Sequence, residues 1–172
     1  ASIPLPSSRD TTAAQRALQI LLVDDDAYNR VVIQAYLQHS PHRITTAENG
    51  RVAIEKFKSA VYDVVLMDIH MPDLDGPSAV RTMRRWEQKN RLSPVPIVAF
   101  TASAIKEELQ ECLNAGFTAH VTKPIKKQRL VETLARYGGT DATPSAQESN
   151  PVRLVQVNIS QSIQSIVPQY LQ

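Results

Sequence analysis

The alternation of short apolar segments with stretches of helical length constrains the fold of this chain more than any other feature. Strands are predicted at 19–23, 43–46, 64–67, 96–100 and 118–122. The first, third and fourth are nearly continuous apolar runs, which is typical of parallel strands that are buried on both faces. The second and fifth are weaker candidates. Strands that alternate with helices at this spacing predict βαβ units.

Helices are predicted between and after these strands at 27–38, 49–58, 77–89, 103–113 and 126–137. In the fourth helix, Ile105, Leu109 and Cys112 recur at helical spacing ahead of Gly116, which favours a helix C-terminus. Pro77 suits a first helical turn. The chain is therefore predicted to be an α/β protein, with a doubly wound five-stranded parallel sheet, (βα)5, over residues 17–138. Ligands of such sheets bind at the carboxyl ends of the strands.

The segments on either side of this predicted domain lack its sustained pattern. Residues 1–16 and 139–151 are rich in small polar residues and proline and are predicted to be flexible linkers. Residues 152–172 first alternate as a strand does and then place apolar residues at helical spacing from Ile159 to Tyr170. We expect this tail to dock on the domain, on a second copy of the chain by self-association, or on a missing part of a longer protein.

The composition excludes several functional classes. A length of 172 residues suits one globular domain with tails. The single Cys112 rules out an internal disulfide framework and a cysteine-based zinc site, and a buried core thiol is its expected role. No apolar run approaches the roughly 20 residues of a membrane span. A net charge of +2 without a dense basic stripe gives no reason to expect nucleic-acid binding.

The start of the chain bears on its origin and location. The first residue is Ala1 rather than Met, and no charged-then-apolar leader follows it. We therefore expect an excised piece of a larger protein without a signal peptide. The lone cysteine agrees with a reducing compartment, so a cytoplasmic location is expected, including the cytoplasmic part of a membrane-bound sensor.

Carboxylates from separate parts of the chain follow two of the predicted strands. Asp24, Asp25 and Asp26 come directly after the first strand, and Asp68 comes directly after the third. The carboxyl ends of parallel strands meet at one edge of the sheet, where these groups would repel each other without a counter-ion. Oxygen ligands of this kind suit Mg²⁺, which usually takes only a few carboxylates and keeps water molecules that a phosphate can replace. In the alternative interpretation, one of the aspartates caps the following helix.

Three residues at strand ends have the chemistry of phosphoryl transfer. A carboxylate beside magnesium can attack phosphorus and form an aspartyl phosphate, and Asp68 is the candidate because it stands alone. Lys123 follows the fifth strand and would neutralise phosphate or carboxylate charge, although most lone lysines are solvated surface groups. Thr101 follows the fourth strand and can donate to a phosphoryl oxygen, although it could equally cap a helix.

Four segments together resemble a known family. The strings LLVDDD, VVLMDIHMPDLDG, PIVAFTA and VTKPI are similar to the four signature segments of response-regulator receiver domains, in the same order and spacing. The resemblance covers about 120 residues. It implies a CheY-like, flavodoxin-like fold that acts as a phosphoryl-accepting signalling switch.

The resemblance also implies a magnesium site. Asp68 would be both the phosphoacceptor and a ligand, Asp25 would bind the metal directly, and Asp24 would be its neighbour in the acidic pair. The backbone carbonyl of His70 would be a further ligand.

Three more positions receive roles from the resemblance. Lys123 would pair with the phosphoryl group and would be joined to Pro124 by a cis peptide bond. Thr101 would bind a phosphoryl oxygen and report its arrival. His120 lies where the family places its switch aromatic residue, often Tyr or Phe, so the presence of histidine puts the details of switching in doubt.

Two other patterns in the sequence suggest different sites. The string 73–76, DLDG, resembles the DxDG of some phosphatases and the start of a calcium-binding loop, but it follows a proline rather than a strand and lacks the later calcium ligands. His70 and His120 suggest a transition-metal site. With only four histidines in the chain, ordinary surface or partly buried positions are the expected ones.

Three functions of different classes therefore compete. The first is the receiver of a hybrid sensor histidine kinase, which takes phosphate from a phosphohistidine of a kinase or a histidine phosphotransfer domain; the strings MDIHMPDLDG and FTASA resemble such receivers. The second is a free-standing response regulator with a protein-contact output, since the tail is too short and insufficiently basic for a DNA-binding module. The third is a magnesium-dependent phosphatase, which would need a general acid and a substrate pocket.

Overall fold

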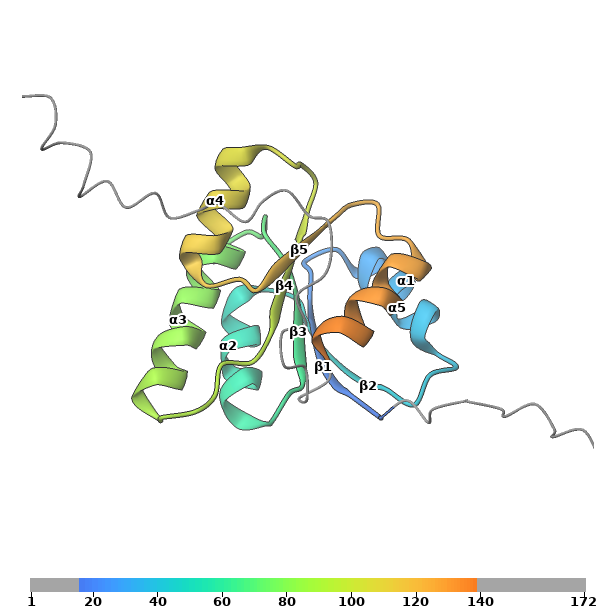
Figure 1. Ribbon diagram of the computed structural model, residues 1–172, viewed down its shortest axis with the longest axis horizontal. Helices are drawn as coiled ribbons and strands as arrows, with labels where there is room; N and C mark the ends of the chain where they lie inside the picture. Colours follow the sequence, from blue (N-terminus) through green and yellow to red (C-terminus); the bar gives the residue numbers. More distant parts are fainter. Residues whose placement is uncertain (1–15, 139–172) are drawn as a thin grey trace, which may run out of the picture. The chain divides into compact units, whose positions relative to one another are not determined.

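The computed structural model describes residues 16–138 (Figure 1). Nearly all of the first predicted linker, the second linker and the predicted tail lie outside these residues. The described elements, in chain order, are β1 (Gln19–Val23), α1 (Ala27–Leu37), β2 (Arg43–Ala47), α2 (Gly50–Ser59), β3 (Val64–Asp68), α3 (Gly76–Lys89), β4 (Ile97–Thr101), α4 (Lys106–Ala115), β5 (Ala119–Thr122) and α5 (Lys127–Tyr137).

The five strands form one parallel sheet in the order β2-β1-β3-β4-β5. In the registers of the sheet, Val23 lies beside Met67 and Asp68 lies beside Phe100. The ends of β1, β3 and β4 are therefore neighbours at the same edge. The order reverses direction between β1 and β3, and this is the position where doubly wound sheets bind ligands. The predicted fold class is confirmed.

The helices cover both faces of the sheet, with α2, α3 and α4 on one side and α1 and α5 on the other (Figure 1). The apolar residues of each strand alternate between two cores. Leu21 and Val65 face the core that contains α2, α3 and α4, whereas Ile20 and Val64 face the core of α1 and α5. Burial on both faces explains why the central strands are continuous apolar runs in the sequence.

Side-chain caps fix the first residues of several helices. The side chain of Asp26 accepts a hydrogen bond from an N–H in the first turn of α1, and Asn49 does so for α2. Asn49 is therefore the cap rather than the first residue of its helix. Pro77 lies in the first turn of α3, as predicted. Gly116 ends α4 with a φ of 108°, a left-handed conformation that costs glycine little.

A buried polar network fastens α3 to two loops. Glu87 is 3% exposed, and its carboxylate accepts hydrogen bonds from the N–H of Val95 and from Arg84, both at 2.8 Å. The guanidinium of Arg84 also donates to the carbonyl oxygen of Val95 at 2.8 Å and to that of Gly116 at 2.9 and 3.0 Å. A Cβ on residue 116 would lie 2.9 Å from the Arg84 side chain, so the network fits closely around this glycine.

Helix α4 is attached unevenly to the rest of the domain. Near its C-terminal end, Cys112 and Ala115 are buried in the core. Burial, together with the charges of Glu108 and Glu111, raises the pKa of the Cys112 thiol to about 11, so this is the inert core thiol that was predicted. At the other end, Ile105 precedes the helix without a side-chain cap and is 59% exposed. Among residues 16–138, no helix has both the length and the apolar character to cross a membrane.

Candidate functional site

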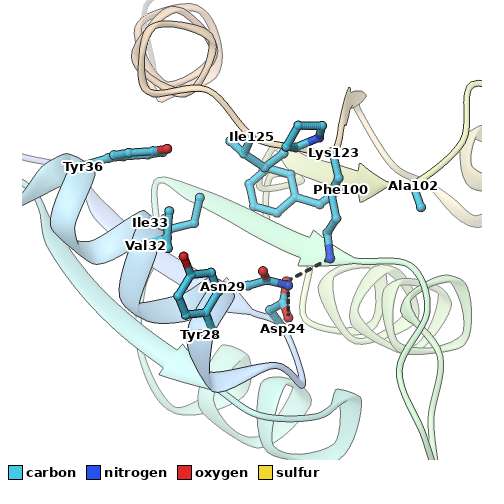
Figure 2. Close-up of a pocket in the computed structure, with 11 residues that line it drawn as sticks. Asp24, Tyr28, Asn29, Val32, Ile33, Tyr36, Phe100, Ala102, Lys123 and Ile125 are labelled. Carbon is cyan, nitrogen blue, oxygen red and sulfur yellow. Dashed lines mark hydrogen bonds and ion pairs between the residues drawn. The ribbon is translucent and has the colours of Figure 1, made fainter.

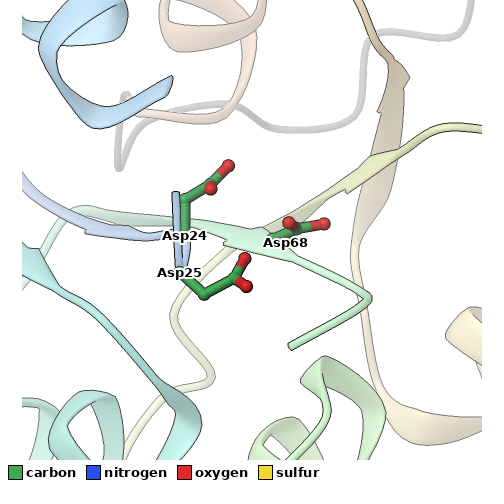
Figure 3. A group of neighbouring side chains, drawn as sticks. All are labelled: Asp24, Asp25 and Asp68. Carbon is green, nitrogen blue, oxygen red and sulfur yellow. The ribbon is translucent and has the colours of Figure 1, made fainter. Parts of the chain in front are cut away.

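Three carboxylates meet at the carboxyl edge of the sheet. Asp24 and Asp25 follow β1, and Asp68 is the last residue of the neighbouring β3. One carboxylate oxygen from each lies within 4.8 Å of the others (Figure 3). The prediction that these groups come together is confirmed, and such an oxygen-rich cluster can hold a hard divalent cation.

The three consecutive aspartates occupy different environments. Asp24 is buried, with 2% exposure, whereas Asp25 and Asp26 are exposed. The carboxylate of Asp26 accepts a hydrogen bond from the N–H of Tyr28 and caps α1. The capping interpretation therefore applies to Asp26 and not to the other two.

Protein donors occupy the carboxylate of Asp24. The N–H of Asp26 donates to Oδ1 at 2.9 Å, and the amide of Asn29 donates to both oxygens at 3.2 Å (Figure 2). The Nζ of Lys123 donates to Oδ2 at 3.1 Å. A carboxylate offers about four lone-pair sites, so these four contacts fill Asp24.

Lys123 bridges the two buried carboxylates. Its Nζ lies 2.8 Å from Oδ2 of Asp68 and 3.1 Å from Oδ2 of Asp24. Its N–H donates to the carbonyl oxygen of Thr101 at 2.7 Å, and its bond to Pro124 is cis. Burial alone would lower the pKa of Lys123, but the hydrogen bonds and charges of Asp68 and Asp24 outweigh it and raise that pKa. The ammonium therefore remains charged.

One carboxylate oxygen of Asp68 has no short hydrogen bond to any residue in the described range. Its Oδ1 has a long contact of 3.4 Å with the N–H of His70, while its Oδ2 is taken by Lys123. Burial raises the pKa of Asp68, with repulsion by Asp24 in the same direction and Lys123 opposing. Within residues 16–138, no hydrogen bond reaches the carboxylate of Asp25. Oδ1 of Asp68 and the carboxylate of Asp25 are thus the groups with room for a cation.

The segment that follows β3 is held close to the site. Gly76 must lack a side chain there, because a Cβ would lie 2.4 Å from the carbonyl oxygen of Asp68. Its N–H donates to the carbonyl oxygen of Ile69 at 2.9 Å. The carboxylate of Asp75 accepts a hydrogen bond from the N–H of Ser78 and caps α3. The DLDG string is therefore a turn that ends in a helix cap.

The side chain of His70 points to α4 and does not join a cluster of metal-binding side chains among the described residues. Its Nε2 lies 2.7 Å from Oε1 of Glu108, in the first turn of that helix. His70 is 70% exposed at its side chain and Glu108 is 18% exposed. Within the described part of the chain, neither His70 nor His120 belongs to a group of potential metal ligands. The partner Glu108 could not be found from sequence, because no motif links it to His70.

Thr101 is engaged in a turn at the end of β4. Its hydroxyl donates to the carbonyl oxygen of Ser103 at 2.6 Å and accepts from the N–H of Ser103 at 3.0 Å. The residue that precedes α4 is Ile105, so the interpretation of Thr101 as a helix cap is wrong. His120 lies beside Ala99 in the sheet and is partly buried. Burial and the positive charge of Arg129 lower the pKa of His120.

Two residues of α1 at the site were not predicted. Asn29 donates to the carboxylate of Asp24, and Arg30 donates to the backbone carbonyl oxygen of Asp24 at 2.6 Å. The only available signal was geometric, since a helix capped at Asp26 turns its first residues back toward the end of β1. Beside them lies an apolar pocket of about 480 Å³, with Asp24 and Lys123 at its end (Figure 2).

A family model for the response regulator receiver domain matches residues 20–135. The chain belongs to this family. The receiver domain of the sensor histidine kinase PA1611 from Pseudomonas aeruginosa is 38% identical, with a TM-score of 0.65 over 73% of this chain and 100% of that one. Its crystal structure has a magnesium ion in the active-site cleft. The predicted CheY-like receiver domain of a two-component phosphorelay is confirmed.

Other relatives of this receiver domain are parts of larger signalling proteins. The sensor histidine kinase GacS of Pseudomonas protegens is 32% identical over 133 residues, and BarA of Escherichia coli is 32% identical over 127. These matches cover 77% and 74% of this chain, which spans only 14% of the length of each kinase. The receiver domain of yeast Ssk1, in complex with the histidine phosphotransfer protein Ypd1, is 26% identical with a TM-score of 0.69, over 71% of this chain and 89% of that one.

Proposed function

We propose that this receiver domain accepts a phosphoryl group on Asp68 from a phosphohistidine, with Mg²⁺ bound beside it. The arrangement of Asp68 with an ammonium at 2.8 Å on one oxygen and a largely open second oxygen carries this proposal. One carboxylate oxygen of Asp68 is the nucleophile, and the other stays available to the metal. A bond forms between the nucleophilic oxygen and phosphorus as the phosphorus–nitrogen bond of the donor breaks, and the imidazole nitrogen keeps that electron pair.

The residues of the acidic cluster have separate tasks in this proposal. Asp25, Asp68 and the backbone carbonyl of His70 hold the metal, whereas Asp24, with its acceptor sites filled by protein donors, contributes charge. Bound Mg²⁺ supplies positive charge that offsets the oxygens of the transferred group. Lys123 adds a second positive charge next to Asp68. The PA1611 receiver, with magnesium in its cleft, supports a magnesium site in this domain.

Incubation with acetyl phosphate and Mg²⁺ tests the proposal. We expect the intact mass of the full chain to rise by one phosphoryl group, and hydroxylamine to remove that group because an acyl phosphate is labile to it. EDTA should prevent labelling, since three carboxylates and one ammonium leave the site with excess negative charge that repels a phosphate dianion. Labelling that persists in EDTA, or that resists hydroxylamine, would contradict this chemistry.

We further propose that residues 17–138 are a receiver within a hybrid sensor histidine kinase, in the cytoplasm. The similarity to GacS and BarA, and the small share of their length that this chain spans, support a longer parent. The Ypd1–Ssk1 complex supports a histidine kinase or a histidine phosphotransfer protein as the partner. A kinase core encoded upstream would favour this parent, and a start codon just before Ala1 would favour a free-standing regulator. Neither the family match nor the described site supports the phosphatase alternative.

Phosphorylation is proposed to be reported through Thr101 and His120. To donate to a phosphoryl oxygen, the Thr101 hydroxyl must leave the carbonyl oxygen of Ser103, which frees the loop before α4. The imidazole of His120 is smaller and more polar than the usual ring, so the resulting switch should be weak. We expect NMR amide shifts on α4, β5 and α5 in response to beryllofluoride, with the response lost in Thr101→Ala and larger in His120→Tyr.

The NMR comparison needs a fixed pH and a control variant. At pH 7 the lowered pKa keeps the imidazole of His120 neutral, so wild type and His120→Tyr differ in the size and polarity of the ring and not in its charge. Ser93→Ala, at an exposed position before β4, serves as the control and should respond as the wild type does. Equal responses in all four proteins would exclude Thr101 and His120 from the readout.

A further inference from the structure

We infer that Asn29 is a positioning residue that acts through Asp24 to keep the ammonium of Lys123 on Asp68. The inference rests on the proposed function of Asp68. It begins from the amide of Asn29, which points from the first turn of α1 at both oxygens of Asp24 (Figure 2). Neither oxygen of Asp24 reaches solvent freely, because the residue is only 2% exposed.

A buried carboxylate must have its acceptor sites filled by the protein. For Asp24, the donors are one backbone N–H, the Asn29 amide and Lys123. Only Lys123 carries charge. Without the amide, Asp24 would keep two donors for about four acceptor sites, and the mobile donor among them is the ammonium on its flexible stem.

Lys123 is divided between two carboxylates. Its Nζ is nearer to Asp68, at 2.8 Å, than to Asp24, at 3.1 Å. The neutral amide of Asn29 fills acceptor sites on both oxygens of Asp24, so the ammonium of Lys123 can stay closer to Asp68. Loss of the amide should reverse this preference, because the side chain of Asp24, at 3% exposure, has less access to replacement water than that of Asp68, at 8%.

The first turn of α1 does not depend on Asn29 for its attachment. Arg30 donates to the backbone carbonyl oxygen of Asp24 at 2.6 Å, and Asp26 caps the helix. Ile33, on the next turn, is buried in the core. A substitution at Asn29 should therefore change the donors of Asp24 and leave the helix in place.

The test compares Asn29→Ala and Asn29→Leu with the wild type as full-length chains. Leucine keeps the branched shape of asparagine, although it is larger, and removes its donors. With acetyl phosphate at saturating Mg²⁺, we expect both variants to be phosphorylated about 10-fold more slowly, because Lys123 is displaced from the phosphoacceptor. Magnesium affinity by calorimetry should be at least as high as in the wild type, since a competing positive charge has moved away from Asp68. Gln34→Ala, at an exposed position of the same helix, should match the wild type in both measurements.

The opposite directions of the two effects separate positioning from a merely structural role. A variant that loses phosphorylation and magnesium binding in parallel has a damaged site, and the inference is then wrong. A wild-type rate in both variants also overturns it. A metal-free crystal structure of Asn29→Ala provides a direct check, with Lys123 Nζ expected to lie nearer to Asp24 than to Asp68. If the wild type itself is not phosphorylated, the proposed function fails instead.

Discussion

Replacing Asp68 with asparagine should lower the rate of phosphorylation by acetyl phosphate on the order of 1000-fold or more. The amide is no nucleophile toward phosphorus, and loss of a nucleophile removes the whole covalent route. Phosphorylation can be followed by intact mass at saturating Mg²⁺. Asp73→Asn makes the same chemical change in the loop after β3, at an exposed residue with a φ of 68° that asparagine tolerates, and should react like the wild type. Equal labelling of the Asp68 variant would remove this residue from the mechanism.

The same substitution should also change how stability depends on pH. Burial is the main reason that the pKa of Asp68 lies above 3.8, with Asp24 adding to the shift and Lys123 opposing it. An acid with a raised folded-state pKa contributes stability below its unfolded pKa, and that contribution is lost as the pH rises through the folded value. Without magnesium at pH 7, Asp68→Asn should therefore unfold at a higher temperature than the wild type. The difference should shrink as the pH falls toward about 4.

Replacing Glu87 with alanine should lower the free energy of unfolding by about 3 kcal/mol or more. Breaking a buried ion pair leaves its partner charge uncompensated, which typically costs about 3–5 kcal/mol. Here the guanidinium of Arg84 would keep only carbonyl partners, and the N–H of Val95 would lose its acceptor. Urea titration followed by circular dichroism measures the change.

An exposed ion pair between α3 and α4 provides the matched control for Glu87. Arg81 and Glu111 lie 3.7 Å apart, and their side chains are 40% and 63% exposed. Solvent screens such a pair, so Glu111→Ala should change stability by less than about 0.5 kcal/mol. Similar losses in the Glu87 and Glu111 variants would mean that the buried network contributes no more than a surface contact does.

The parts of this protein that were predictable from sequence are those where chemistry coincides with the end of a strand. Asp24, Asp68, Thr101 and Lys123 each lie at or next to such an end, so the fold alone places them together. The strand and helix positions followed from the change of apolar period. Most boundaries shifted by a residue or two, as at α2 where Asn49 is the cap, and the start of α4 shifted by three residues.

The residues that could not be predicted reach the site from helix faces. The roles of Asn29 and Glu108 depend on where α1 and α4 lie against the sheet, and a polar residue in a helix has no pattern that distinguishes a site contact from a solvated position. The partner of Thr101 was missed for a related reason. Its hydrogen bonds with Ser103 are set by the local turn, which the loop sequence does not specify.

The uneven attachment of α4 makes this helix a lever. Its fulcrum is the C-terminal end, where Cys112 and Ala115 are buried. Just beyond them, the carbonyl oxygen of Gly116 accepts two hydrogen bonds from Arg84. The whole helix is about 15 Å long for 10 residues, and its N-terminal end begins just beyond the loop that Thr101 secures, with Glu108 in its first turn in contact with His70. We therefore expect a shift of that loop to displace the first turn of α4 more than its buried end.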